Sequence, residues 1–379
     1  MKFFHISDLH LGKRVNEFSM IDDQFDILQK IVLLAKEHKP DAVLIAGDVY
    51  DKSMPYVEAV QLLDGFLVRL NELQISVFMI SGNHDSVERV AFGADLLKHS
   101  NIHIVRSYRG QLTPVSVNDD YGKLNVWMLP YLKPALVRRE LEKPDVITYT
   151  EALAAVLSDI ELDAAERNVL VAHQFVTGAE IGESEEIYIG GSENVDGSLF
   201  DAFDYVALGH LHRPQHVGRE TLRYCGTPLK YSFSEVNDQK SVTVVDMGDK
   251  GDVVISEIPL SPIREMRVIR GTYDELMNRN HYSGTNTDDY IRVILTDEHE
   301  EPDAQRKLEM IYKNLMCFEY DNKRTQAAST FTTAVAADKR TPAQHFGDFF
   351  EMQNGRSMTG EQIEYATGLF NKIFEEASI

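Results

Sequence analysis

Residues 2–10 read Lys2-Phe3-Phe4-His5-Ile6-Ser7-Asp8-Leu9-His10, an apolar run that ends in two potential metal ligands. Asp8 and His10 stand two residues apart, so both side chains point to the same side of an extended strand end. Four other apolar runs end in the same kind of residue. The motifs that follow them are Gly47-Asp48-Val49-Tyr50-Asp51, Gly82-Asn83-His84-Asp85, His173 and Gly209-His210-Leu211-His212. This arrangement predicts buried strands whose ends carry Asp, Asn and His side chains.

Strand and helix patterns alternate along the first part of the chain. Strands are predicted at Lys2–Ser7, Ala42–Ala46, Val77–Ser81, Val126–Pro130, Val169–Ala172 and Tyr205–Leu208. Helices are predicted at about Met20–Glu37, with Phe25 on the apolar face, and at about Val57–Leu73. This alternation predicts a layered α/β architecture. After Gly209 the predicted strands follow one another without a long helix, at Thr221–Cys225, Ser241–Met247 and Asp252–Ile258, and suggest a second sheet packed on the first.

A composition change near Pro259–Pro262 predicts the end of a first domain, residues 1–260. Residues 261–325 read as a small α+β domain whose second helix, Asp303–Leu315, begins after Pro302. Residues 326–342, rich in Thr, Ala and Ser, read as a linker. Residues 343–379 read as C-terminal helices, one with a capping box of Thr359 and Gln362. These helices have too little apolar area to fold alone, so they dock on the body or bind a partner.

The amino-acid composition indicates which partners and which cellular environment suit the protein. The chain has 379 residues, of which 38 are Lys or Arg and 60 are Asp or Glu, for a formal charge of −22. So acidic a chain is repelled by a nucleic-acid backbone unless metals, a basic strip or a basic partner offset the charge. Only two cysteines occur, Cys225 and Cys317, and no apolar stretch approaches the length of a membrane span. We therefore expect a soluble, cytoplasmic protein without a disulfide framework.

The donor atoms of the five motifs favour particular metals. Carboxylate and amide oxygens with imidazole nitrogens, and no thiolate, favour Mn²⁺, Mg²⁺, Fe or Zn²⁺. The carboxylate of Asp48 can bridge two cations with its two oxygens. Other histidines are expected to be ordinary structural or surface residues, namely His5, His38, His99, His103, His216, His281 and His345. Each motif alone could be a turn, because Gly and Asp favour turns, but five in order at strand ends predict a metal site.

The order DxH, GDxxD, GNH[DE], H and GHxH resembles that of the calcineurin-like metallophosphoesterases. The resemblance implies a β-sandwich flanked by helices and a site for two divalent ions. One ion would be held by Asp8, His10, Asp48 and His212, and the other by Asp48, Asn83, His173 and His210. Two such ions activate a water and clamp the oxygens of a phosphate. The resemblance makes His84 the residue that protonates the leaving oxygen or stabilises the transition state, and gives Asp85 the task of orienting His84 by a hydrogen bond.

Three further stretches resemble the bacterial SbcD nuclease family: Phe4–Lys13, Ile187–Glu193 and Tyr224–Glu235. This second resemblance implies a Mn²⁺-dependent DNA nuclease subunit with double-strand exonuclease and single-strand or hairpin endonuclease activity. It implies that the chain acts together with an SbcC-type, SMC-like ATPase in DNA end processing, repair and recombination. It also implies a homodimer, for which Val57–Leu73 and Val87–Leu97 are the candidate helices, and a tail that docks on the coiled coil of SbcC. The residues 261–325 would then be a capping domain.

Two other functions stay open at this point. A small-molecule phosphodiesterase acting on nucleotides would use the same metal motifs, and it would not need a tail that binds a partner. A scaffold that kept the fold and lost the chemistry is the third reading, although every expected ligand and His84 are present. Basic residues that could line a DNA path are Lys13, Arg14, Arg89, Arg106, Arg109 and Lys230, and each is also an ordinary surface charge.

Overall fold

The computed structural model describes residues 1–180, 182, 193–323, 325, 344, 346–347, 349–351 and 356–376, with side chains as far as residue 370. The chain divides into two compact units. Unit 1 comprises Met1–Ile269, Tyr282–Val293 and Glu309–Cys317, and unit 2 comprises Arg270–His281, Ile294–Leu308 and Phe318–Ile379. Within the described part of the chain, no helix is both long and apolar enough to cross a bilayer.

The first of two six-stranded sheets has the order β16-β15-β1-β4-β5-β6. These strands are β16 (Val253–Pro259), β15 (Ser241–Met247), β1 (Lys2–Ile6), β4 (Ala42–Ala46), β5 (Ser76–Ile80) and β6 (Ile102–Ile104). The last four run parallel, and β15 pairs antiparallel with β1. Helices α1 (Ile21–His38) and α2 (Val57–Glu72) bury their apolar faces on this sheet, where Ile31 and Leu70 share a core with Val43 and Val77. The parallel strands are buried on both faces, which explains their unbroken apolar runs.

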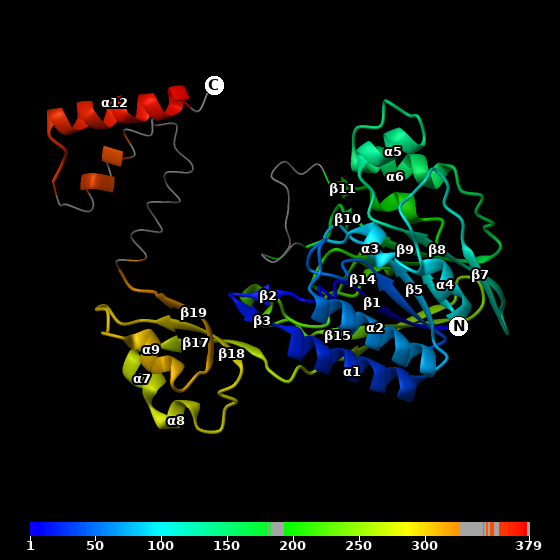
Figure 1. Cartoon of the computed structure of the whole chain (residues 1–379), viewed down its shortest axis with the longest axis horizontal. Coiled ribbons are helices and arrows are strands. Elements are labelled where there is room, and N and C mark those ends of the chain that lie inside the picture. Colours follow the sequence, from blue (N-terminus) through cyan, green and yellow to red (C-terminus); the bar gives the residue numbers. More distant parts are fainter. Residues whose placement is uncertain are drawn as a thin grey trace. The chain divides into compact units, whose positions relative to one another are not determined.

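The second sheet has the order β13-β14-β12-β9-β8-β7. Its strands are β13 (Gln215–Val217), β14 (Arg219–Tyr224), β12 (Tyr205–Gly209), β9 (Arg167–His173), β8 (Gly122–Leu129) and β7 (Val115–Asp119). Helices α5 (Pro134–Glu140) and α6 (Tyr149–Ser158) cover its outer face, and a capping box of Thr148 and Glu151 begins α6. Figure 1 shows α1 and α2 on one side of the paired sheets and α5 and α6 on the other.

The two sheets meet through side chains that point inward from both. Phe3, Leu44 and Phe78 of the first sheet share a fully buried core with Val169 and Tyr205 of the second. Alternation along each strand sends one set of side chains to this core and the other set to the covering helices. The expected α/β fold, a β-sandwich flanked by helices, is thereby confirmed.

Several shorter elements complete the two units. They are β2 (Arg14–Val15), β3 (Phe18–Ser19), β10 (Phe175–Val176) and β11 (Asn194–Val195), with the 3-10 helices η1 (Lys98–Ser100), η2 (Gly197–Phe200) and η3 (Phe233–Glu235). A three-stranded sheet is formed by β17 (Met266–Gly271), β18 (Tyr290–Leu295) and β19 (Asn314–Tyr320), with helices α7 (Tyr273–Met277), α8 (Arg279–Tyr282) and α9 (Ala304–Glu309) in the same part of the chain.

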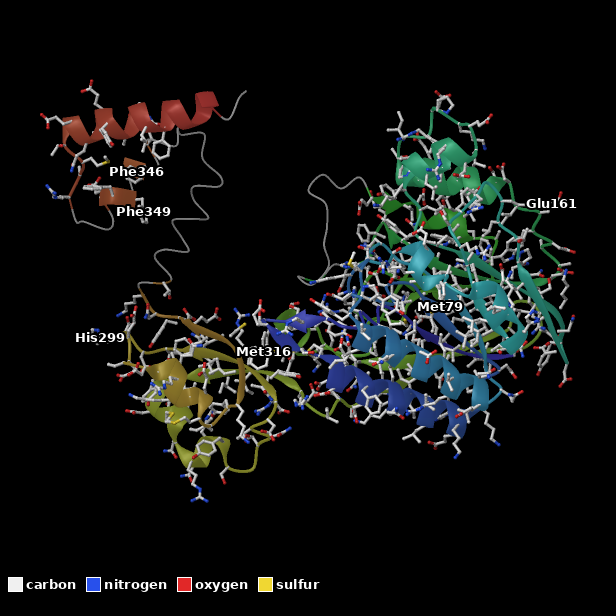
Figure 2. All side chains as sticks on the ribbon, in the orientation of Figure 1. Met79, Glu161, His299, Met316, Phe346 and Phe349 are labelled. Atoms are coloured by element: carbon white, nitrogen blue, oxygen red, sulfur yellow. The ribbon has the colours of Figure 1, made fainter. Side chains whose placement is uncertain are left out.

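The C-terminal helix is α12 (Gly360–Glu376). It begins with the predicted capping box, since the Thr359 amide donates to Gln362 Oε1 at 2.9 Å and the Gln362 amide donates to Thr359 Oγ1 at 3.4 Å. Phe346 lies beside this helix, with its ring centre 5.9 Å from that of Phe370 (Figure 2). The predicted linker, residues 326–342, lies outside the described residues, as does most of Ile187–Glu193.

Four expectations about the elements are wrong. The strands β15 and β16 join the first sheet beside β1, and of the three strands predicted after Gly209 only β14 belongs to the second. The candidate helix Val87–Leu97 is two short helices, α3 (Val87–Val90) and α4 (Ala94–Leu97), because Gly93 between them has φ +74°. The helix predicted from Asp303 begins one residue later and ends at Glu309, since Asp303 itself has φ +57°. On α1, Phe25 is exposed, and Ile27 and Ile31 occupy the buried face instead.

Candidate metal centre

The predicted ligands come together at one edge of the sandwich. Asp8, Asp48 and Asn83 follow β1, β4 and β5, which are parallel neighbours, so their carboxyl ends meet at the same edge. His173 ends β9, and His210 follows the parallel neighbour β12 in the other sheet. The two edges are joined where the backbone amide of His210 donates to both oxygens of Asp8, each at 3.1 Å.

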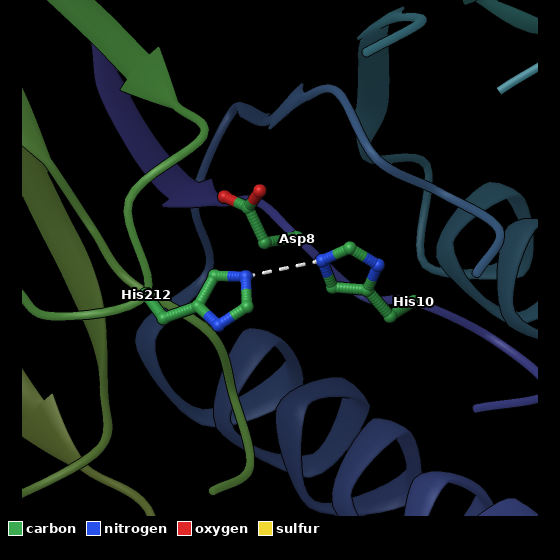
Figure 3. Close-up of side chains that lie close together, drawn as sticks. All are labelled: Asp8, His10 and His212. Carbon is green, nitrogen blue, oxygen red and sulfur yellow. Dashed lines mark hydrogen bonds between the residues drawn. The ribbon is translucent and has the colours of Figure 1, made fainter. Parts of the chain in front are cut away.

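Asp8, His10 and His212 form one group of donors. Their ligand atoms all lie within 4.8 Å of one another. Figure 3 shows a nitrogen of each ring pointing at the other beside the carboxylate, with Nε2 of His10 3.2 Å from Nε2 of His212. All three residues are buried, and Asp8 also accepts a hydrogen bond from the hydroxyl of Ser7. A cation bound between these atoms could accept a lone pair from each Nε2 and would take the place of this contact.

Asn83, His173 and His210 form the second group. The Asn83 Oδ1 atom lies 2.9 Å from His173 Nε2 and 3.0 Å from His210 Nδ1. Asp48 lies between the two groups, because its Oδ2 atom is 3.4 Å from His173 Nε2 and 3.8 Å from His10 Nε2. The structure thus brings all seven predicted ligands together and gives Asp48 the position that a bridging carboxylate requires. Their roles as ligands stay predictions.

Burial and charge set the protonation of these donors. Burial works to lower the pKa of His173, but the carboxylates of Asp48 and Asp8 and the hydrogen bond to the Ala46 carbonyl together outweigh it and raise that pKa to about 9. Burial lowers the pKa of His210 to about 3 and holds that of His10 well below its usual value. For Asp48, the neighbouring histidines outweigh burial and hold its pKa well below the usual range. Divalent cations bind neutral imidazoles and ionised carboxylates, which are the protonation states of His10, His210 and Asp48. A bound cation would displace the extra proton of His173. The donor residues therefore fit divalent ions.

His84 borders the two groups and is only partly buried. Its Nε2 atom lies 3.9 Å from Asp48 Oδ2, and its side chain is 21% exposed. Its Nδ1–H donates to the backbone carbonyl of Asp51 at 3.1 Å. That hydrogen bond leaves Nε2 as the atom that faces the metal groups, which is the placement a proton donor to a leaving oxygen needs.

The expected hydrogen bond between the His84 ring and the Asp85 carboxylate is wrong. The Asp85 carboxylate accepts three backbone hydrogen bonds, from the amides of Val49 at 3.0 Å, Tyr50 at 2.9 Å and Gly82 at 2.9 Å. Asp85 therefore ties the loop after β4 to the loop after β5. The partner that orients the His84 ring is the carbonyl of Asp51.

Gln24 is a functional residue that the sequence analysis missed. Its side chain, buried on α1, donates to the His10 carbonyl at 2.8 Å and accepts from the Gly12 amide at 2.9 Å. Tyr231 supports the same loop by donating to the Leu9 carbonyl at 2.6 Å. The only signal in the sequence is a polar residue within the apolar face of a helix. By contrast, His5 has the structural role expected of it, with Nδ1 2.9 Å from the Tyr205 hydroxyl.

The two adjoining groups of Asp, Asn and His donors at the strand ends of this α/β sandwich are compatible with a binuclear metal site, and together with the family match below they support the class of metal-dependent hydrolases. Comparison with known families agrees. Residues 1–214 match the profile of the calcineurin-like phosphoesterase family, and residues 262–354 match the SbcD C-terminal profile, described as the Type 5 capsule protein repressor C-terminal domain. The chain belongs to the calcineurin-like phosphoesterase family, and the two matches together give it the SbcD domain architecture.

Similar solved structures include a dimetal phosphatase from Danio rerio and the protein TT1561 of Thermus thermophilus. The first is 11% identical, with a TM-score of 0.40, and the match covers 68% of this chain and 95% of that one. The second is 12% identical, with a TM-score of 0.38, and the match covers 68% of this chain and 98% of that one.

Proposed function

We propose that this chain is a two-metal DNA nuclease, the subunit that cuts DNA in a complex with an SbcC-type, SMC-like ATPase. The observation that carries the proposal is the convergence of seven donor side chains beside His84 in a chain with the SbcD domain architecture. Mn²⁺ is the ion we expect, and Mg²⁺ fits the same oxygen and nitrogen donors. The reaction would hydrolyse the backbone without a covalent intermediate.

When bound, the two ions supply Lewis acidity to the phosphate and lower the pKa of a water nucleophile. The chain's own residues do the rest. Asp48 lies between both donor groups and fixes their spacing. His84, held at Nδ1 by the Asp51 carbonyl, presents Nε2 to protonate the leaving oxygen. The Asp85 carboxylate holds the loops that carry Asp48 and His84 at a fixed separation.

The charge distribution supports a partner that contributes to the grip on DNA. Three of the basic residues considered for a DNA path are paired with acids: Lys13 with Asp51 at 2.8 Å, Arg106 with Asp95 at 2.6 Å and Lys230 with Glu265 at 2.8 Å. Cations engaged in this way attract phosphates less strongly. With a formal charge of −22, the chain is expected to bind DNA weakly by itself.

Two surfaces support the proposed assembly. In unit 1, apolar side chains stay exposed on the candidate dimer helices, with Val57 and Val68 on α2 and Phe92 and Leu96 around α4. In unit 2, Phe349 and Ile363 are exposed near or on α12, which suits a helix pair that docks on a coiled coil. We propose a homodimer through the first surface and docking on SbcC through the second. Full SbcC binding after deletion of the residues that follow Pro342 would contradict the second assignment.

A small-molecule phosphodiesterase is the alternative, because a substrate smaller than DNA would also be compatible with the acidic balance of the chain. The deciding experiment is a nuclease assay on linear and hairpin duplex DNA with Mn²⁺, with and without the ATPase and ATP. Bis-p-nitrophenyl phosphate serves as the small substrate, and His84→Gln as the inactive control. Duplex cleavage that rises with the partner and is lost in His84→Gln supports the nuclease. Turnover of the diester without DNA cleavage under any condition would establish the alternative.

A further inference from the structure

The contact between His10 and His212 requires a particular pair of tautomers once a cation is bound. The two Nε2 atoms are 3.2 Å apart, so in the metal-free protein one nitrogen must donate to the other. A shared cation needs a lone pair on both Nε2 atoms, and each ring must then carry its proton on Nδ1. Both rings are buried, so each Nδ1–H needs an acceptor within the protein.

A carboxylate lies behind each of these rings. Nδ1 of His10 is 3.9 Å from Asp51 Oδ1, and Nδ1 of His212 is 3.6 Å from Glu235 Oε1. Among the residues that the structure describes, His10 Nδ1 and Glu235 Oε1 are buried atoms without a hydrogen-bond partner. Both distances are slightly longer than a hydrogen bond, and each would become one if the ring moved slightly on binding a cation.

A lysine holds each carboxylate. Lys13 Nζ lies 2.8 Å from Asp51 Oδ1, and Lys240 Nζ lies 2.5 Å from Glu235 Oε2. The Lys240–Glu235 pair is almost completely buried, with 3% and 4% of the two side chains exposed. Lys240 also donates to the His212 carbonyl at 2.9 Å, so the pair contacts both the backbone and the ring of one ligand. A buried ion pair adds little stability relative to apolar packing, which favours a role at the site.

His173 also has an acceptor for its Nδ1–H, and here the acceptor is a neutral carbonyl. Its Nδ1–H donates to the Ala46 carbonyl at 2.8 Å, and Nε2 faces Asn83 and Asp48. Metal-bound histidines generally donate their other N–H to a carbonyl or a carboxylate, which fixes the tautomer and the orientation of the ring. In this site the carbonyl serves His173, and the two lysine-held carboxylates are placed to serve His10 and His212.

We propose that Asp51 and Glu235 are positioning residues of the metal centre. They accept Nδ1–H from His10 and His212 and turn both Nε2 lone pairs toward one cation, while Lys13 and Lys240 hold the carboxylates in place. The inference rests on the proposed two-metal function. It also gives a role to Asp51, the second aspartate of the GDxxD motif, which is not among the expected ligands.

The first test is Mn²⁺ binding by calorimetry, independent of any substrate. Asp51→Asn and Glu235→Gln should each weaken the binding of one ion by roughly 10–100-fold, the usual effect of losing such a partner. Glu265→Gln is the matched control, because Glu265 also pairs with a lysine, and no histidine among the described residues forms an ion pair with it. Wild-type affinity in both test variants would overturn the inference. Absence of Mn²⁺ binding by the wild-type protein would instead overturn the proposed function, and the inference with it.

The second test reads the tautomers directly. Long-range ¹H–¹⁵N correlation spectra of the Zn²⁺-loaded protein should show His10 and His212 protonated at Nδ1. Glu235→Gln should shift the Nδ1 proton of His212 and leave that of His10 unchanged, and Asp51→Asn should do the reverse. If Glu235→Gln does not fold because Lys240 loses its partner, the double variant Glu235→Gln/Lys240→Met removes both charges. Unchanged His212 resonances and Mn²⁺ affinity in that folded variant would refute the role of Glu235.

Discussion

Gly209→Ala should damage the contact between the two sheets at the metal centre. Gly209 ends β12, and a Cβ atom added there would lie 1.9 Å from the Ala46 carbonyl oxygen and 2.8 Å from Nδ1 of His173. The same carbonyl accepts the hydrogen bond that orients His173. Because the closest atom belongs to the backbone of β4, no side-chain rotation can relieve the clash.

The size of the effect follows from that geometry. Cβ atoms essentially never approach a heavy atom within 3.0 Å, so the ends of β4 and β12 must separate by about 1 Å in a close-packed core. Overpacking of this kind costs roughly 1–3 kcal/mol, and a backbone obstacle places this variant at about 3 kcal/mol. Domains are commonly stable by about 5–15 kcal/mol, so the variant should still fold.

Urea unfolding in the presence of EDTA measures the stability loss, and calorimetry measures the Mn²⁺ affinity, which should fall as Ala46 and His173 move apart. Gly65→Ala is the matched control. Gly65 lies within α2 with no atom within 4 Å of an added Cβ, so alanine should stabilise the helix by about 0.5–1 kcal/mol. A Gly209→Ala variant with the unfolding midpoint and Mn²⁺ affinity of the wild type would refute the close approach of the sheets.

Three other predictions concern the ions and the protons of the site. His84→Gln should keep both Mn²⁺ sites and lower turnover roughly 10²–10⁴-fold through loss of a general acid, as measured on DNA and on the small diester. Asp48→Ala should abolish binding of at least one ion, and two intact Mn²⁺ sites by calorimetry would contradict its bridging position. The pKa of His173 is raised to about 9, so its charge stabilises the metal-free protein below pH ~6.5, and that stabilisation is lost as the pH rises through 9. Urea unfolding in EDTA should show a loss of up to about 3 kcal/mol across this range, and His173→Gln should remove it.

The sequence predicts best the strands that are buried on both faces, such as β4, β9 and β12. The bounds of β4 and β15 are those expected from their apolar runs. What fails is the assignment of strands to sheets. Apolar runs such as β15 carry no sign of their neighbours, and pairing with β1 is decided by tertiary packing.

The ligands could be found from the sequence because each motif holds its donors at a fixed spacing. The residues that support them could not be found in this way, because their partners lie far away in the chain. Gln24 bonds the His10 carbonyl from α1, and Glu235 lies behind His212. Asp85 does not bond its sequence neighbour His84. Its carboxylate instead accepts a hydrogen bond from the backbone amide of Val49, 36 residues away.

The backbone itself explains why these ligands need a rigid support. Asp8, His10, Asp48 and His210 all have positive φ, at 52°, 43°, 46° and 104°. Such conformations cost of order 1–3 kcal/mol each for residues other than glycine and persist only where the surroundings hold them. Here the loop after β1 pairs with the loop after β4, since the amides of Asp8 and His10 donate to the carbonyls of Gly47 and Asp48, each at 3.0 Å. The strain is therefore borne by hydrogen bonds between the strand ends, which hold the donors in position.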